Sequence, residues 1–166
     1  MISDRLKDAF ITHMNAEFQS YYLYLSMSAY LDENSWTGMT NWMAAQAEEE
    51  REHAMKFYEH LAHRGVRPIL KTIAEPKHEW NSVLEIFEDS LEHEKQISSL
   101  IHNLMDIAVE ERDHIAQSFL QWFIDEQVEE EDTVGTIVDQ IKRVADDPRG
   151  LMLIDAELGK RQQSAP

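Results

Sequence analysis

The chain contains no cysteine and few residues that interrupt helices. Without cysteine, a disulfide framework, a thiolate metal site and a cysteine nucleophile are all excluded. Only 5 glycines and 4 prolines occur among 166 residues, so long uninterrupted helices are expected. No apolar run approaches the roughly 18 residues of a membrane span, and the N-terminal MISDRLKDAF lacks the apolar stretch of a signal peptide. We therefore expect a cytoplasmic protein with no membrane partner.

Basic residues are also scarce. The chain has 15 Lys and Arg residues against 32 Asp and Glu residues, which gives a net charge of −17. Nucleic acids and anionic membranes attract patches of Lys and Arg, so neither is an expected partner. The acidic excess either keeps the protein in solution or binds cations, and composition alone favours the first explanation. The positions of the acidic residues decide between the two.

Apolar residues recur at steps of three or four over four long stretches and one short one, which predicts helices. A connection of about 15 residues, 66–80, contains Pro68 and Pro76 and separates the second helix from the third. Short turns join antiparallel neighbours, whereas a connection of this length lets the chain cross the whole bundle. We predict an all-α fold: a four-helix bundle with a long crossover between helices 2 and 3, and a short fifth helix. The expected helices cover residues 4–32, 36–64, 81–108, 113–146 and 151–158.

The whole chain is expected to form one domain. Residues 1–147 would form the bundle, and residues 148–166 would add the short C-terminal helix and a tail to the same domain. The last seven residues, KRQQSAP, are expected to fray. The apolar short helix has no obvious partner within a single bundle, which suggests that other subunits cover it.

Polar residues interrupt the apolar stripe of every long helix. On the first helix, for example, Glu17 shares a face with Met14 and Tyr21. Each interruption falls near the midpoint of its helix, and in a bundle of equally long helices the midpoints lie at one level. One acid on an apolar face usually has a local explanation, but four interruptions at one level predict a shared polar layer. Its members are Glu17, Glu50, His53, Glu94, Gln127 and Glu130.

This predicted layer has the composition of a metal site. Carboxylates buried close together repel one another, and either protonation or a divalent cation relieves the repulsion. Oxygen ligands with one imidazole suit iron, manganese or zinc, and the lack of thiolates disfavours copper(I). Residues 50–53 read Glu-Arg-Glu-His, a Glu-x-x-His spacing that places both ligands on one helical face.

Four segments around these residues resemble bacterial non-haem ferritins, in the same order and with matching gaps over nearly the whole chain. The segments are NAEFQSYYLYLSMS, AEEEREHA, LEHEKQI and WFIDEQVEEE. The resemblance implies a ferritin-like bundle with two adjacent iron positions. One would use Glu17, Glu50 and His53. In the other, Glu50 would bridge to Glu94 and Glu130, with Gln127 close by.

The resemblance implies further site residues as well. A third iron position is expected from Glu49, Glu126, Glu129 and Glu130. Tyr24 corresponds to a tyrosine beside the di-iron centre, and Trp122 is similarly placed, although core packing is an equally good explanation for both aromatics. The other histidines are assigned packing or surface roles, and His13, one turn before Glu17, is the candidate for a contact with a ligand.

Three departures from related families shape the prediction. Bacterioferritins carry a haem-ligating Met directly after a ligand Glu, whereas here Arg51 follows Glu50, so no haem is expected. A second Glu-x-x-His is replaced by Gln127-Val128-Glu129-Glu130. Finally, the positions that resemble the acidic channel of animal ferritins are Gln117 and Leu120, which leaves the entry route of iron open.

The expected function is oxidation of Fe(II) by O2 or H2O2 at the di-iron centre, with storage of ferric mineral inside a homo-oligomeric shell of 24 subunits. The shell is implied by the resemblance alone. Two alternatives stay open at this point. One is a di-iron oxygenase or peroxidase that acts on an organic substrate and normally needs the second Glu-x-x-His. The other is a metal buffer or acidic scaffold without catalysis.

Overall fold

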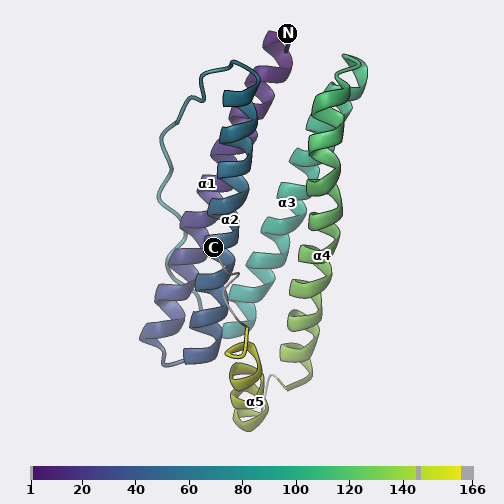
Figure 1. The fold of residues 1–166 in the computed structure, drawn as a ribbon. Helices are drawn as coiled ribbons and strands as arrows, with labels where there is room; N and C mark the ends of the chain where they lie inside the picture. Colours follow the sequence, from purple (N-terminus) through teal and green to yellow (C-terminus); the bar gives the residue numbers. More distant parts are fainter. Residues whose placement is uncertain (1, 145–146, 162–166) are drawn as a thin grey trace.

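The structure is a computed structural model that describes residues 2–144 and 147–161. Over these residues the chain forms five α-helices and no strands, which confirms the all-α prediction (Figure 1). None of these helices is long and apolar enough to cross a membrane. The predicted end of the fourth helix at residues 145–146 lies outside the described residues. The helices are α1 (Asp4–Glu33), α2 (Thr37–His63), α3 (Val83–Glu110), α4 (His114–Val144) and α5 (Pro148–Leu158).

The predicted crossover is present between α2 and α3. The chain leaves the end of α2 and runs the length of the bundle before α3 begins, so α2 and α3 point the same way (Figure 1). Side chains of α1 form hydrogen bonds with the backbone of this crossover. The Asn15 amide donates to the carbonyl of Ile69 at 2.8 Å and accepts from the N–H of Lys71 at 2.7 Å. In the same manner, the Gln19 amide donates to the carbonyl of Ala74 and accepts from its N–H.

Local signals in the sequence account for several helix ends. The hydroxyl of Ser3 and the carboxylate of Asp113 cap α1 and α4. Gly65 has φ of 72°, a left-handed conformation that suits glycine and ends α2. The start of α2 is different, because no side chain of its own caps it. Instead, the backbone N–H of Met39 donates to the carboxylate of Asp155 on α5 at 2.8 Å.

The expectation that α5 lacks a partner within the bundle is wrong. Its side chains Leu151, Ile154 and Leu158 pack against the apolar cluster at the adjoining end of the bundle, and we infer from this contact that α5 belongs to the same domain. The opposite face of α5 stays open, with Met152 65% exposed and Leu153 74% exposed. The apolar pattern of α5 does not reveal this partner, because α5 lies against the end of the bundle and not along its sides (Figure 1).

Two buried apolar clusters form the core, one toward each end of the bundle. Near the N-terminus, Phe10 and Phe57 belong to the first cluster. Near α5, Met39 and Phe87 belong to the second. Each long helix contributes to both clusters, so each passes through the middle of the bundle between them. The two clusters thus leave a layer at mid-height that other side chains fill.

Candidate metal centre

The predicted polar layer fills the space between the two apolar clusters. Its six side chains are all buried, with exposed fractions from 1% for Glu17 to 7% for Glu130. Along each helix, the polar residue stands where the apolar residues change from one cluster to the other. The structure thus brings together Glu17 from α1, Glu50 and His53 from α2, Glu94 from α3, and Gln127 and Glu130 from α4.

Glu17, Glu50 and His53 form the tightest group. Each offers one ligand atom, and these atoms lie within 4.8 Å of one another; within residues 2–144 and 147–161 no other trio of His, Asp or Glu meets this spacing. Burial lowers the pKa of His53, which favours the neutral imidazole that can bind a metal. One carboxylate oxygen of Glu17, Oε2, is buried and has no hydrogen-bond partner among the described residues. The group therefore fits a divalent cation.

Glu50 lies at the centre of the layer. Burial raises its pKa well above the usual range, and the nearby charges of Glu94, Glu17 and Glu130 raise it further. Glu50 thus interacts electrostatically with one carboxylate from each of the other three long helices. Such a group is neutral when the site holds only protons, and it can become a bridging ligand when cations replace them.

Glu94 is held by side chains from two other helices. The hydroxyl of Tyr24 donates to its carboxylate and also lies 3.0 Å from the hydroxyl of Ser90. On the other side, the amide of Gln127 donates to Glu94 Oε2 at 3.1 Å. Burial raises the pKa of Glu94 to about 7, against the lowering effect of these hydrogen bonds. Both Tyr24 and Gln127 therefore orient a carboxylate of the layer.

Gln46 is a member of the layer that the sequence analysis missed. Its side-chain Nε2 donates to Glu130 at 2.8 Å and to Glu50 at 3.2 Å. The bond to Glu130 partly offsets burial and the charge of Glu94, which together raise the pKa of Glu130 to about 8. The signal in the sequence was a polar residue on the inward face of α2, one turn before Glu50.

His13 also contacts the site, so the packing or surface role favoured for it is wrong. It is buried, and its Nε2 lies 2.7 Å from Glu17 Oε1. Burial alone would raise the pKa of Glu17, but the neighbouring His13 and His53 lower it overall. Glu17 is therefore the carboxylate of the layer that carries its negative charge most readily, and His13 fixes its orientation.

The residues predicted for a third position lie beside this layer. Burial raises the pKa of Glu126, and the charges of Glu129 and Glu49 raise it further, so the three acids share one electrostatic environment. Glu49 also contributes to the raised pKa of Glu130, which joins this group to the central layer. The side chains of Glu49 and Glu126 are half-buried, and that of Glu129 is exposed. We name Glu49, Glu126, Glu129 and Glu130 the outer cluster.

Comparison with known proteins identifies the family. Residues 7–144 match the ferritin-like domain family. A bacterial non-heme ferritin of Staphylococcus epidermidis is 42% identical over 161 residues, which cover 97% of each chain. Another, from Staphylococcus saprophyticus, is 40% identical over 97% of this chain and 96% of its own. The chain belongs to the ferritin family.

Solved ferritin structures have the same fold. A humanized archaeal ferritin gives a TM-score of 0.98 at 41% identity, covering 99% of this chain and 100% of its own. An open-pore ferritin from the hyperthermophilic archaeon Archaeoglobus fulgidus gives 0.96 at 41% identity, covering 98% and 100%. The bundle, the crossover and α5 therefore form a ferritin fold, as the resemblance predicted.

The aromatic residues of the site have different surroundings. Tyr24 is fully buried and bonded to Glu94. Trp122, in contrast, is 41% exposed. Its ring meets that of His53 edge-on, with centroids 5.5 Å apart, and the ammonium of Lys56 lies 4.2 Å from its centroid. Trp122 is therefore not a core residue, although its ring packs against His53.

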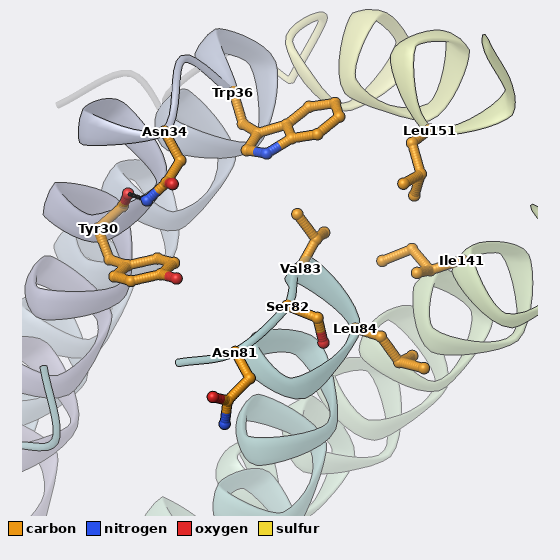
Figure 2. Close-up of a pocket in the computed structure, with 9 residues that line it drawn as sticks. All are labelled: Tyr30, Asn34, Trp36, Asn81, Ser82, Val83, Leu84, Ile141 and Leu151. Atoms are coloured by element: carbon orange, nitrogen blue, oxygen red, sulfur yellow. Dashed lines mark hydrogen bonds between the residues drawn. The ribbon is translucent and has the colours of Figure 1, made fainter. Parts of the chain in front are cut away.

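A pocket of about 440 Å³ lies at the end of the bundle near α5, away from the polar layer. Its lining side chains, shown in Figure 2, come from α1, α3, α4, α5 and the neighbouring connections. The Asn34 amide donates to the carbonyl of Tyr30 at its edge. None of the carboxylates of the layer lines this pocket. Its lining residues are Tyr30, Asn34, Trp36, Asn81, Ser82, Val83, Leu84, Ile141 and Leu151.

Proposed function

We propose that this ferritin oxidises Fe(II) in the central layer and stores the ferric product. Iron storage is the function of the family to which the chain belongs. The observation that carries the site assignment is the buried group of Glu17, Glu50 and His53, with Glu50 close enough to Glu94 and Glu130 for their charges to raise its pKa. Here iron is a substrate rather than a resident cofactor.

Each residue of the central layer has a separate role in this proposal. Glu17 and His53 bind one Fe(II), Glu94 and Glu130 bind the second, and Glu50 bridges the two. Gln127 is neutral and sets the orientation of Glu94 through its hydrogen bond. Carboxyl groups whose pKa is raised by burial release protons when Fe(II) enters. The two Fe(II) ions give two electrons to dioxygen, which takes up two protons and leaves as hydrogen peroxide, and the anionic oxygens stabilise the Fe(III) formed.

The test is the rate of the first oxidation after Fe(II) is mixed with oxygenated apo-protein. Glu17→Ala and His53→Ala each remove a ligand, and we expect the ferric absorbance to develop at least about tenfold more slowly. Glu59→Ala, at an exposed position of α2, serves as the matched control and should keep the parent rate. Parent rates in both ligand variants would refute the di-iron assignment. If no fast ferric absorbance forms in the parent either, the chain is a metal buffer.

The outer cluster is proposed as a third iron position. It holds four carboxylates and no histidine, so it should bind iron more weakly than the central layer. Fe(II) bound there would supply electrons to the hydrogen peroxide formed at the centre, so that two further Fe(II) ions and two protons convert it to water. Occupation of the position would slow the turnover of the centre. Glu49→Ala and Glu126→Ala should keep the fast first oxidation but change the iron consumed per O2. An oxygen electrode measures this ratio, and unchanged ratios with unchanged second-addition rates would exclude a functional outer cluster.

We also propose a shell of 24 subunits. The exposed Met152 and Leu153 on α5 give the chain an apolar surface that another subunit would bury. Light scattering of the purified protein should give the mass of twenty-four 19.4-kDa chains. A stable monomer at working concentration would contradict storage in a shell. The cytoplasm, where such a shell would meet reduced iron, is the proposed location.

Neither haem nor an organic substrate is part of the proposal. Arg51, at the position of the haem-ligating Met of bacterioferritins, donates to Glu48 at 2.6 Å. Protein expressed with ample haem should therefore show no stoichiometric Soret band. The pocket in Figure 2 touches none of the proposed ligands, so nothing in its position favours an oxygenase over a ferroxidase.

A further inference from the structure

Arg161, three residues beyond the end of α5, lies against one face of α2. Its guanidinium carbon is 4.6 Å from the centroid of the Trp42 ring. Nη1 donates to Gln46 Oε1 at 3.0 Å, and Nη2 donates to Glu49 Oε2 at 2.5 Å. These three partners follow one another at steps of four and three residues, so they form a continuous helical stripe. The position expected to fray is thus held by an aromatic ring, an amide and a carboxylate.

The approach of α5 to α2 determines where Arg161 lies. A Cβ atom added at Gly38 would lie 1.7 Å from the backbone oxygen of Asp155, so only glycine permits this contact. On the other chain segment, a Cβ at Gly159 would lie 3.1 Å from Gly38 Cα. The Asp155 carboxylate also accepts from the N–H of Met39. Two residues after Gly159 the chain reaches Arg161, so the guanidinium is placed by a fixed helix contact.

The guanidinium affects both parts of the metal centre. Arginine only donates hydrogen bonds, so the Gln46 oxygen must face Arg161. The amide nitrogen of Gln46 is then directed toward Glu50 and Glu130, where it donates to both carboxylates. At the same time, Arg161 forms an ion pair with Glu49, whose side chain is about one quarter exposed. Glu49 and Glu130 are two of the four members of the outer cluster.

We propose that Arg161 is a positioning residue of the metal centre that acts as a built-in counter-cation for the outer cluster. By pairing with Glu49, it occupies a ligand of the third position and places a positive charge beside the others. A divalent cation must therefore either displace the guanidinium from Glu49 or bind against its repulsion. Arg161 thus makes the outer cluster bind more weakly than the central layer, which lets the central positions fill first. This inference rests on the proposed third position.

The test measures Co2+ binding to the full-length apo-protein by equilibrium dialysis and by the ligand-field absorption of bound Co2+. Glu126→Ala identifies the outer cluster, because it should remove the weakest of the bound Co2+ ions. Arg161→Gln removes the counter-cation, and we expect it to tighten that weakest site about tenfold while the central sites keep their affinity. Arg161→Lys keeps the charge and should stay near the parent affinity.

Lys160→Gln is the matched control. It removes one positive charge from the adjacent position, where Lys160 pairs with Glu157 instead of Glu49, and it should leave the weakest site unchanged. Circular dichroism and light scattering verify that the variants fold and assemble. An unchanged or weaker outer site in Arg161→Gln would overturn the inference and reduce Arg161 to a clamp on α5. If Glu126→Ala binds as many Co2+ ions as the parent, the third position itself fails, whatever Arg161 does.

Discussion

At both ends of the bundle the helices meet through side chains such as Phe57 and Met39, whereas at mid-height they meet through carboxylates such as Glu50. All of these side chains are almost fully buried. Burying a large apolar side chain stabilises a fold by about 1.5–3 kcal/mol. Burying carboxylates together is unfavourable unless they are protonated or bind cations. The same four helices thus carry two stabilising regions, and between them lies a region whose composition is explained by binding rather than by folding.

The largest effect should follow from a cavity in an apolar cluster. The Phe57 ring packs against four neighbouring rings, with centroids 4.5 Å from Phe123 and 4.6 Å from His13. Phe57→Ala should lower the free energy of unfolding of the apo-protein by about 3–5 kcal/mol, the usual cost of such a cavity. Guanidinium denaturation of apo-protein measures it, with Tyr58→Ala at the adjacent exposed position as control. A loss under about 1 kcal/mol would contradict the distinction between the regions.

Sequence patterns were sufficient to predict the helices but not the contacts outside their apolar stripes. Few glycines and prolines and a clear helical period define each stripe, so the helix ranges and the crossover could be predicted. The bonds from Asn15 and Gln19 to the crossover could not, because polar residues on an outer helix face usually contact water. The docking of α5 was also missed, since a glycine contact such as Gly38 with Asp155 has no periodic signal.

The same limit applies to the site. The carboxylates and His53 could be predicted because a charge on an apolar stripe is conspicuous. Gln46 and His13, by contrast, have side chains that occur in many cores, and their roles come from particular partners: Glu130 and Glu50 for Gln46, and Glu17 for His13. Arg161 was missed for another reason: it follows a short helix near the chain end, where fraying is the usual outcome. Residues 162–166 of the expected frayed tail lie outside the described residues.

The next effect is a dependence of apo stability on pH that originates in the central layer. Glu94 has a pKa of about 7 and Glu130 of about 8 in the folded chain, because burial raises both. Between about pH 4.5 and 8 these two carboxyls therefore hold protons in the folded chain that they have released in the unfolded chain, so their contribution to the free energy of unfolding falls as the pH rises. Glu94 alone should contribute about 3 kcal/mol across its own part of this window.

Denaturation of apo-protein at several pH values checks this prediction. Glu94→Gln should remove the falling contribution of Glu94 between about pH 5 and 7, because the amide does not titrate. Glu92→Gln, on the exposed side of the same helix, should leave the slope as in the parent. A Glu94→Gln curve parallel to that of the parent between pH 5 and 7 would mean that Glu94 is charged in the absence of metal.

A somewhat smaller effect concerns stabilisation by metal. A cation that binds only the folded chain at 100 times its Kd adds about 2.7 kcal/mol to the free energy of unfolding. Glu50→Gln replaces the bridging carboxylate by a neutral group of similar shape, so apo stability at pH 7 should hold or rise while most of this gain disappears. Thermal denaturation with and without Zn2+ measures both quantities, and Glu59→Gln provides the exposed control on α2. An undiminished Zn2+ effect in Glu50→Gln would move the binding site away from the layer.

The smallest effect should come from the edge of the layer, where an apolar cluster and the metal ligands share a residue. Tyr24 belongs to the cluster near α5 through its ring and to the layer through its hydroxyl, which donates to Glu94. Tyr24→Phe keeps the ring, so the free energy of unfolding should change by no more than about 1 kcal/mol. It removes a hydrogen bond that lowers the pKa of Glu94, so that pKa should rise above about 7.

In Tyr24→Phe, a metal ion that binds Glu94 must therefore displace a proton that the carboxyl holds more tightly than in the parent. Calorimetric titration with Zn2+ should show affinity reduced about threefold to tenfold at pH 6.5 in Tyr24→Phe, with most of the difference lost at pH 8, where Glu94 is deprotonated more fully. Tyr22→Phe, on the exposed side of α1, is the control and should match the parent at both pH values. A loss of affinity that is equal at both pH values would show that the hydroxyl acts on the geometry of the site and not on the proton of Glu94. If the Zn2+ affinity is unchanged at both pH values, Tyr24 contributes only its ring to the apolar cluster, and its hydroxyl is not part of the metal site.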